Sequence, residues 1–242
     1  MNTSTQPVIK SIEIIFEDEY LIVVNKPNNV IIHESHYARN IKETTLLKFL
    51  EQQLGYPVYP VHRLDRKTSG IILLLKEKEN VNQFQTLFTS NKIQKTYYAI
   101  VRGFSKEKGI IDSPVKNDDT GIYKEALTNY TSVNNIEIDI PVHPYTKSRY
   151  SLIKLMPETG RMHQLRKHLN KINHPIVGDY KYGDRFHNRM FETEFNCIYM
   201  FLHAFQLDFT HPITTENLIL KANFPTDWQM LFQKFNWTLN EN

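Results

Sequence analysis

The chain has 242 residues, of which 40% are hydrophobic and 23% are charged, and this composition excludes wholesale disorder. Its single cysteine, Cys197, excludes an internal disulfide and a zinc site built mainly from thiolates, and we expect it to be a small buried hydrophobe. The net charge of +3 permits nucleic-acid binding without requiring it. The longest apolar run, residues 71–75, is too short to cross a bilayer, and residues 1–7 lack the pattern of a secretion signal. We therefore expect a cytoplasmic protein without membrane contact.

Hydrophobic spacing predicts more strands than helices, and the two kinds of element do not alternate regularly. This order favours an α+β fold, with a mixed, mostly antiparallel sheet flanked by helices and loops. We expect residues 1–10 to form a flexible tail and residues 11–242 to form one domain. In chain order the sequence predicts strands over 12–16 and 21–24, a helix over 45–54 that stops at Gly55, a strand over 71–75, a helix over 79–88, strands over 97–101 and 110–111, a polar loop over 116–121, strands over 126–133 and 150–155, a helix over 162–172, a polar loop over 183–188, strands over 200–209 and 218–220, and a last helix that a capping-box pattern opens at Thr226.

The segment that carries chemistry runs from Val61 to Gly70 and reads VHRLDRKTSG. It places one carboxylate among four cationic or potentially cationic side chains, directly before a turn and a buried strand. If the residues before the turn are extended, Arg63 and Asp65 share one face and Leu64 points the other way. Asp65 then lies near the end of the sheet. The simpler alternative is a basic loop in which Asp65 only balances charge or caps the turn.

This segment resembles the signature of the RluA-type pseudouridine synthases. Four further segments resemble motifs of that family in the same order, and together the matches cover most of residues 12–224. The resemblance implies the pseudouridine synthase catalytic fold, with no S4-like RNA-binding domain before a first strand that starts near residue 12. At Asn29 the family usually has glycine; asparagine tolerates the left-handed region, so we expect the turn to survive. The four segments are Asn25–Pro27, Lys95–Gly103, Thr159–Leu169 and His174–Asp179.

The chain is most similar to the tRNA-modifying members of the family. The shared features are the compact length, residues 144–150 and 181–184, and the terminal helix that runs from Trp228 to Trp237. This similarity implies uridine 65, in the T-arm stem of tRNA, as the target. Ribosomal RNA and another tRNA site stay open as alternatives, because the catalytic motifs do not select the substrate. Peripheral loops select it, and we expect residues 116–125 and 186–196 to do so here.

The resemblance assigns three catalytic residues. It makes Asp65 the covalent catalyst, either by attack on the base or by a route that starts at the sugar. It pairs Arg166 with Asp65, which would keep that carboxylate ionised; the alternative is an arginine in solvent or on a phosphate, because Arg166 lies on the polar side of its predicted helix. It stacks Tyr97 on the target uracil; the alternative is a core tyrosine, because Tyr97 shares the apolar strand face. Its neighbour Tyr98 faces the other way and is expected to be structural.

The resemblance also implies an RNA-binding surface. Arg63 would enter the space that a flipped uridine leaves in the helix, or else contact a phosphate. For the two histidines of the set, packing is as good an explanation as RNA contact, and each lysine or arginine has the alternative of a plain surface charge. His203 is expected to support the site. The remaining predicted RNA-binding residues are His62, Lys67, Arg161, His163, Lys167, Lys171 and Lys181.

Pseudouridine formation is an isomerisation, so we expect no cofactor and no metal. The partner is tRNA, or alternatively ribosomal RNA, and we expect a monomer without an obligate protein partner. Two other classes are weaker. A non-catalytic RNA-binding module would be favoured if Asp65, Tyr97 or Arg166 were replaced, and all three are present. A glycosidase or nuclease usually needs a second acid or an acidic cluster beside Asp65, and the motif has none.

Overall fold

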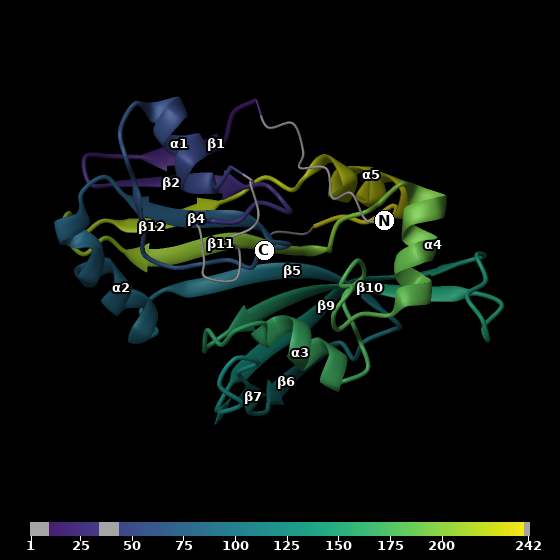
Figure 1. Ribbon diagram of the computed structural model, residues 1–242. Helices are drawn as coiled ribbons and strands as arrows, with labels where there is room; N and C mark the ends of the chain where they lie inside the picture. The colour runs from purple at the N-terminus through teal and green to yellow at the C-terminus, as the bar shows by residue number, and fades with distance from the viewer. Residues whose placement is uncertain (1–9, 34–43, 240–242) are drawn as a thin grey trace. The chain divides into compact units, whose positions relative to one another are not determined.

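The computed structural model describes residues 10–33 and 44–239, and the chain falls into two compact units. The first unit takes residues up to 94 together with 204–223, and the second takes 95–203 together with 224–242. The predicted α+β class with a mostly antiparallel sheet is confirmed (Figure 1). Apart from residue 10, the predicted tail lies outside the described residues. None of the described helices is long and apolar enough to cross a membrane.

The sheet of the first unit is built around β4, whose seven residues are all buried. The neighbouring strands follow the order β1, β2, β4, β11, β12, and the short β3 also pairs with β4. The β2–β4 pairing is antiparallel and runs from Leu21 opposite Leu75 to Lys26 opposite Gly70, so the motif that precedes β4 lies beside the end of β2. The elements are β1 (Glu13–Glu17), β2 (Leu21–Lys26), α1 (Leu46–Leu54), β3 (Tyr59–Pro60), β4 (Ser69–Leu75), the 3-10 turn η2 (Lys78–Asn80), α2 (Val81–Thr89), β11 (Leu202–Thr210) and β12 (Asn217–Lys221).

Helix α1 follows its sequence closely. Thr45 caps its first turn by accepting a hydrogen bond from the Lys48 N–H, and Gly55 ends the helix in the left-handed conformation with φ 83°. Leu46 and Leu50 are fully buried, and each contributes about 1.5–3 kcal/mol of burial free energy. The predicted helix over 45–54 is therefore confirmed.

The sheet of the second unit follows the order β5, β10, β9, β6, and its pairings are antiparallel. A separate hairpin, β7 with β8, projects from the connection between β6 and β9. The elements are β5 (Gln94–Arg102), β6 (Lys108–Asp112), β7 (Val115–Lys116), β8 (Tyr123–Lys124), β9 (Leu127–Ile138), β10 (Ser148–Pro157), α3 (Gln164–Lys171), α4 (Arg185–Phe195) and α5 (Thr226–Phe235).

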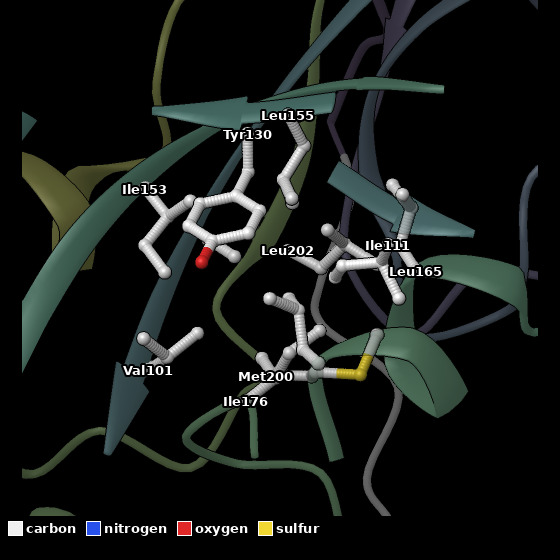
Figure 2. Packing of buried hydrophobic residues seen from close by; sticks show 11 residues of the cluster. Val101, Ile111, Tyr130, Ile153, Leu155, Leu165, Ile176, Met200 and Leu202 are labelled. Carbon is white, nitrogen blue, oxygen red and sulfur yellow. The ribbon is translucent and has the colours of Figure 1, made fainter. Parts of the chain in front are cut away.

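The core of the second unit lies between this sheet and α3 (Figure 2). Ala99 and Val101 of β5 and Ile153 and Leu155 of β10 supply the sheet side, and α3 contributes Leu165 and Leu169, four residues apart on one helix face. Packing of Leu165 and Leu169 in this cluster fixes the rotation of α3 about its axis. It therefore also fixes the direction of the polar side chains between the two leucines.

Two predictions about helices are wrong. Residues 183–188, predicted as a polar loop, contain the start of α4: the Asp184 carboxylate accepts hydrogen bonds from the N–H groups of Phe186 and His187 and so caps a helix. In α5 the predicted capping box does not form. Pro225 occupies the cap position without a side-chain hydrogen bond, and Thr226 is already the first helical residue. The other polar loop, at residues 116–121, forms the turn of the β7–β8 hairpin.

Candidate active site

Asp65 lies in the first unit, in an irregular segment that leads into β4. Leu64 is buried, Asp65 is partly buried and Arg63 is exposed, so Leu64 faces away from its two neighbours as predicted for an extended chain. The Thr68 N–H donates to the Asp65 carbonyl at 3.1 Å, which closes the turn after the carboxylate. The backbone around Asp65 is therefore fixed by a tight turn and by the strand that follows.

The Lys26 side chain is hydrogen-bonded to this turn. Its Nζ, fully buried, donates to three carbonyl oxygens, those of Pro27 at 2.8 Å, Val30 at 3.0 Å and Arg66 at 3.1 Å. These acceptors use all three protons of the ammonium group. Burial lowers the pKa of Lys26 to about 7, although the charge of Asp65 acts in the opposite direction. Lys26 therefore joins the turn after β2 to the segment that carries Asp65.

Asn29 adopts the left-handed conformation with φ 63°, so the predicted turn survives the replacement of glycine. Its side-chain oxygen accepts a hydrogen bond from Arg66 Nε at 2.9 Å. Asparagine thus supplies an acceptor that glycine lacks. Its bond to Arg66 is a second hydrogen-bonded link between the Asp65 segment and residues 27–30. The Lys67 carbonyl accepts a hydrogen bond from the Asn28 side chain, which is a third tie.

His62 is held by packing contacts. Its ring stacks on Phe88 with 4.4 Å between centroids, and its Nε2 accepts a hydrogen bond from the Leu73 N–H of β4. These contacts agree with the packing alternative. Arg63 is exposed and Lys67 is partly exposed, so both side chains reach the surface of the first unit. RNA contact by these three residues stays a prediction.

Tyr97 lies on β5 in the second unit, opposite Leu155 of β10. It is partly buried and packs against the core cluster with Ala99 and Val101, as its position on the apolar strand face predicts. Tyr98 points to the other face and contacts the Phe224 ring at 5.6 Å between centroids. One side of the Tyr97 ring is therefore supported by the core.

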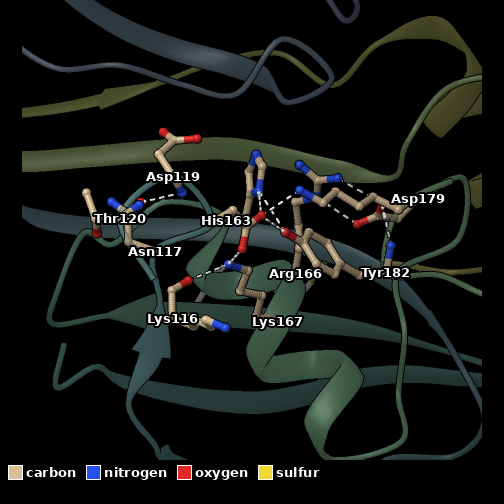
Figure 3. Close-up of polar contacts among 11 residues, drawn as sticks. Lys116, Asn117, Asp119, Thr120, His163, Arg166, Lys167, Asp179 and Tyr182 are labelled. Carbon is tan, nitrogen blue, oxygen red and sulfur yellow. Dashed lines mark hydrogen bonds and ion pairs between the residues drawn. The ribbon is translucent and has the colours of Figure 1, made fainter. Parts of the chain in front are cut away.

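Arg166 is buried on α3, with 6% of its surface exposed, so the alternative of an arginine in solvent is wrong. Its Nε and Nη2 donate to the two oxygens of Asp179 at 2.7 and 2.9 Å (Figure 3). Burial raises the pKa of Asp179, but the hydrogen bonds and charge of Arg166, with the N–H groups of Lys181 and Tyr182, outweigh it and leave the pKa below the usual value. This two-point contact fixes the plane of the guanidinium. The predicted pairing of Arg166 with Asp65 stays a prediction.

Four predicted or neighbouring polar groups converge on Asp118, at the turn of the β7–β8 hairpin. Lys167 Nζ and Lys181 Nζ each donate to its carboxylate at 2.5 Å, and the Tyr182 hydroxyl donates at 2.7 Å. His163 Nδ1 lies 3.0 Å from the same hydroxyl. These hydrogen bonds hold the pKa of Asp118 well below its usual range. The Arg166 guanidinium lies 5.0 Å from the centroid of the Tyr182 ring, so the predicted residues His163, Lys167 and Lys181 are brought together with Arg166.

The remaining predicted residues of the second unit lie apart from this cluster. Arg161 is exposed and its Nε donates to the Glu125 carbonyl at 3.0 Å. Lys171 is exposed and donates to the Ser113 hydroxyl. His203 is fully buried, with its ring 4.9 Å from that of Phe224, and Cys197 is buried as predicted.

Sequence reasoning missed the partners of these residues. Asp179 stands 13 positions after Arg166 and Asp118 stands 49 positions before Lys167, so no helical or strand periodicity links the pairs. Tyr182, which contacts both His163 and Asp118, was not predicted either. Lys26 was recognised only as part of a motif. Asp179 and Tyr182 were likewise recognised only as members of the segments His174–Asp179 and 181–184.

Comparison with known proteins gives one consistent result. The family described as RNA pseudouridylate synthase matches residues 20–171. A protein of Vibrio parahaemolyticus named tRNA pseudouridine synthase C is 38% identical over 93% of this chain and 96% of its own length. A protein of the same name from Pasteurella multocida is 39% identical over 95% and 98%. The solved structure titled human RNA pseudouridylate synthase domain containing 4 is 25% identical, covers 94% of both chains and has a TM-score of 0.71.

Proposed function

The chain belongs to the RNA pseudouridylate synthase family, and on that premise we propose that it isomerises a uridine of tRNA, uridine 65 in the T-arm stem, to pseudouridine. The observation that carries the choice of tRNA is the similarity over nearly the whole length to proteins named tRNA pseudouridine synthase C. Asp65, Tyr97 and Arg166 are all present, which favours an active enzyme over an RNA-binding module without activity.

The reaction breaks the bond between C1′ of the ribose and N1 of the uracil, and forms a bond between C1′ and C5. The proton on C5 leaves and N1 gains one, so substrate and product have the same atoms and no electrons are exchanged with another molecule. The enzyme therefore needs a group that stabilises or captures the detached fragment, a group that moves a proton, and a surface that holds the base while it turns.

Asp65 takes the first role in this proposal. A carboxylate acts as a covalent catalyst when it is ionised and cannot turn away from its target. The turn closed by Thr68, the three hydrogen bonds of Lys26 and the buried neighbour Leu64 support that requirement. Tyr97 offers its ring to the uracil, and its support by the core suits a stacking platform.

Arg166 takes an electrostatic role. Its guanidinium is oriented by Asp179, and in this proposal its positive charge keeps the Asp65 carboxylate ionised. We propose that residues 11–242 act as one catalytic domain, as a monomer in the cytoplasm.

A uridine in a stem is stacked and paired, so the enzyme has to extrude it, at a cost of a few kcal/mol. The exposed Arg63, two residues before Asp65, is the residue that we propose to fill the vacated space. Lys67 and Arg161, both accessible to solvent, would contact phosphates.

The test uses an unmodified tRNA transcript without any added cofactor, and carbodiimide labelling locates pseudouridine at each base. We expect conversion at position 65 with the wild type, and a loss of at least about 10⁴-fold with Asp65→Asn at nearly unchanged tRNA affinity, because the amide cannot act as the nucleophile. Asp208→Asn, the same change at another partly exposed aspartate of the first unit, serves as the control and should stay active.

Conversion of another tRNA position, or of a ribosomal RNA fragment alone, would contradict the assignment of uridine 65. Measurable conversion by Asp65→Asn would instead contradict the role of Asp65. The two results are separate, because the first concerns where the product appears and the second concerns which variant makes it.

A further inference from the structure

The cluster around Asp118 is built like an anion-binding site that already holds an anion. Two ammonium groups, Lys167 Nζ and Lys181 Nζ, and the Tyr182 hydroxyl all donate to one carboxylate. The Tyr182 ring lies beneath both ammonium groups, at 5.5 Å from Lys167 Nζ and 5.2 Å from Lys181 Nζ. A carboxylate and a phosphodiester each present two equivalent anionic oxygens to donors of this kind.

The charge of the cluster is not balanced by its own residues. Asp118 supplies one negative charge against the two lysines, and the nearby Arg166 is already paired with Asp179. If the carboxylate of Asp118 left, two ammonium groups and a hydroxyl donor would remain on one patch. Burial and the acceptor at Asp118 raise the pKa of Tyr182 to about 12, so its hydroxyl stays protonated and donates.

Asp118 stands on the part of the hairpin that is suited to move. Its turn is self-contained: the Asn117 side chain accepts from the N–H groups of Asp119 and Thr120, and the Asn117 carbonyl accepts from Gly121. The strands of the hairpin have two residues each. By contrast, the base of the hairpin is fixed, because the Ser113 carbonyl contacts buried His168 Nε2 at 2.9 Å. The Lys116 carbonyl also accepts a hydrogen bond from Lys167 Nζ at 2.6 Å, so a displacement confined to the turn after Lys116 moves Asp118 and leaves the base of the hairpin in place.

We propose that Lys167, Lys181 and Tyr182 form a subsite for one phosphodiester of RNA, and that the Asp118 carboxylate occupies this subsite until RNA displaces it. The inference rests on the proposed function, because it assumes that RNA binds this protein. It adds a residue that opposes binding: Asp118 competes with the RNA backbone and thereby selects for substrates that place a phosphate at this point. A fixed structural ion pair is the competing explanation, although exposed ion pairs contribute little to stability and the Lys181 side chain is half-exposed.

The experiment compares Asp118→Asn with Asp119→Asn by fluorescence anisotropy on an unmodified tRNA T-arm hairpin, at several salt concentrations. Both variants gain the same net charge, and the side chains are neighbours on one exposed turn, but only Asp118 contacts the cluster. Asparagine keeps an oxygen acceptor for the lysines while it removes the competing charge. We expect Asp118→Asn to bind about two- to fivefold more tightly than Asp119→Asn, the size of one exposed charge pair.

In the reverse direction, Lys181→Gln should weaken binding and lower the salt slope by about 1, as loss of one phosphate contact does. Equal or weaker binding by Asp118→Asn relative to Asp119→Asn would overturn the proposal, as would an unchanged salt slope for Lys181→Gln. If the wild type binds another RNA and not tRNA, the tRNA assignment fails and the same variants are compared on that RNA. If it binds no RNA, both proposals fail.

Discussion

Gly70, at the junction of the Asp65 segment and β4, tolerates no side chain. Its φ is 112°, and a Cβ added there would lie 2.1 Å from the Ala204 carbonyl oxygen of β11, which is a backbone atom that has no room to yield. The close approach of two strands directly after the Asp65 segment therefore depends on a single glycine.

We expect Gly70→Ala to lower the free energy of unfolding by about 3 kcal/mol or more, because the backbone must both adopt a strained φ and part from β11. The measurement is the midpoint of urea unfolding. Gly160→Ala is the matched control, since nothing lies within 4 Å of its added Cβ and its φ is not positive. Equal midpoints for the two variants would contradict this account.

At the level of single residues, the sequence predicted those that belong to a contiguous motif. Asp65, Tyr97 and Arg166 could be named because each stands in a recognisable segment. Asp118 could not, because its significance comes from partners that folding brings near. Asp179 stands in a recognised segment, but its bond to Arg166 depends on tertiary structure. Asn29 lies between these cases: its tolerance of the left-handed region was predicted, whereas its bond to Arg66 depends on tertiary structure.

Among the elements, those with a strong hydrophobic run were predicted best. β4 is an apolar run that is buried along its whole length. The leucines of α1 recur at helical spacing, which predicts a helix. α4 was missed because its first residues are polar and follow a glycine, a composition typical of loops. The β7–β8 hairpin was missed because strands of two residues carry no periodicity.

Asp184 is the residue on which the start of α4 depends. Its carboxylate accepts two backbone hydrogen bonds and also the Arg102 Nη1 group at 2.6 Å. We expect Asp184→Ala to lower the free energy of unfolding by about 1–2 kcal/mol, the upper part of the range for loss of a helix cap, because the hydrogen bond to Arg102 is lost as well. Arg189→Ala, at an exposed position of the same helix, should change it by less than about 0.5 kcal/mol in a thermal unfolding experiment. If Asp184→Ala lowers the free energy of unfolding no more than Arg189→Ala does, Asp184 does not stabilise the start of α4.

For the whole molecule, buried histidines make the free energy of unfolding depend on pH. His168, His187 and His211 are buried, and burial lowers the pKa of each below its usual value of 6.5. His211 Nδ1 accepts hydrogen bonds from two backbone N–H groups, so protonation at that nitrogen would remove both. The folded chain therefore favours the neutral form of these side chains.

The sign of the effect follows from proton binding. As pH falls through about 6.5, the unfolded chain gains protons that the folded chain does not take up, so the free energy of unfolding decreases, by at most about 1.4 kcal/mol per pH unit for each histidine. We expect the melting temperature to fall between pH 7.5 and 5.5, and His211→Asn to reduce that dependence. Asp179 and Asp184, whose pKa values lie below normal, act only at more acidic pH, below about 4. The same pH dependence in wild type and His211→Asn would show that His211 does not contribute.

The buried ammonium of Lys26 has a consequence for the reactivity of the chain. Acylating reagents attack only the free amine form of a lysine, and burial lowers the pKa of Lys26 to about 7. Yet Lys26 is fully enclosed, with its nitrogen surrounded by three carbonyl oxygens, so no reagent reaches it while the turn is closed. Lys26 is therefore unreactive in the native protein and becomes labelled only when the segment beside Asp65 opens. The rate at which Lys26 is labelled would therefore report how often that segment opens.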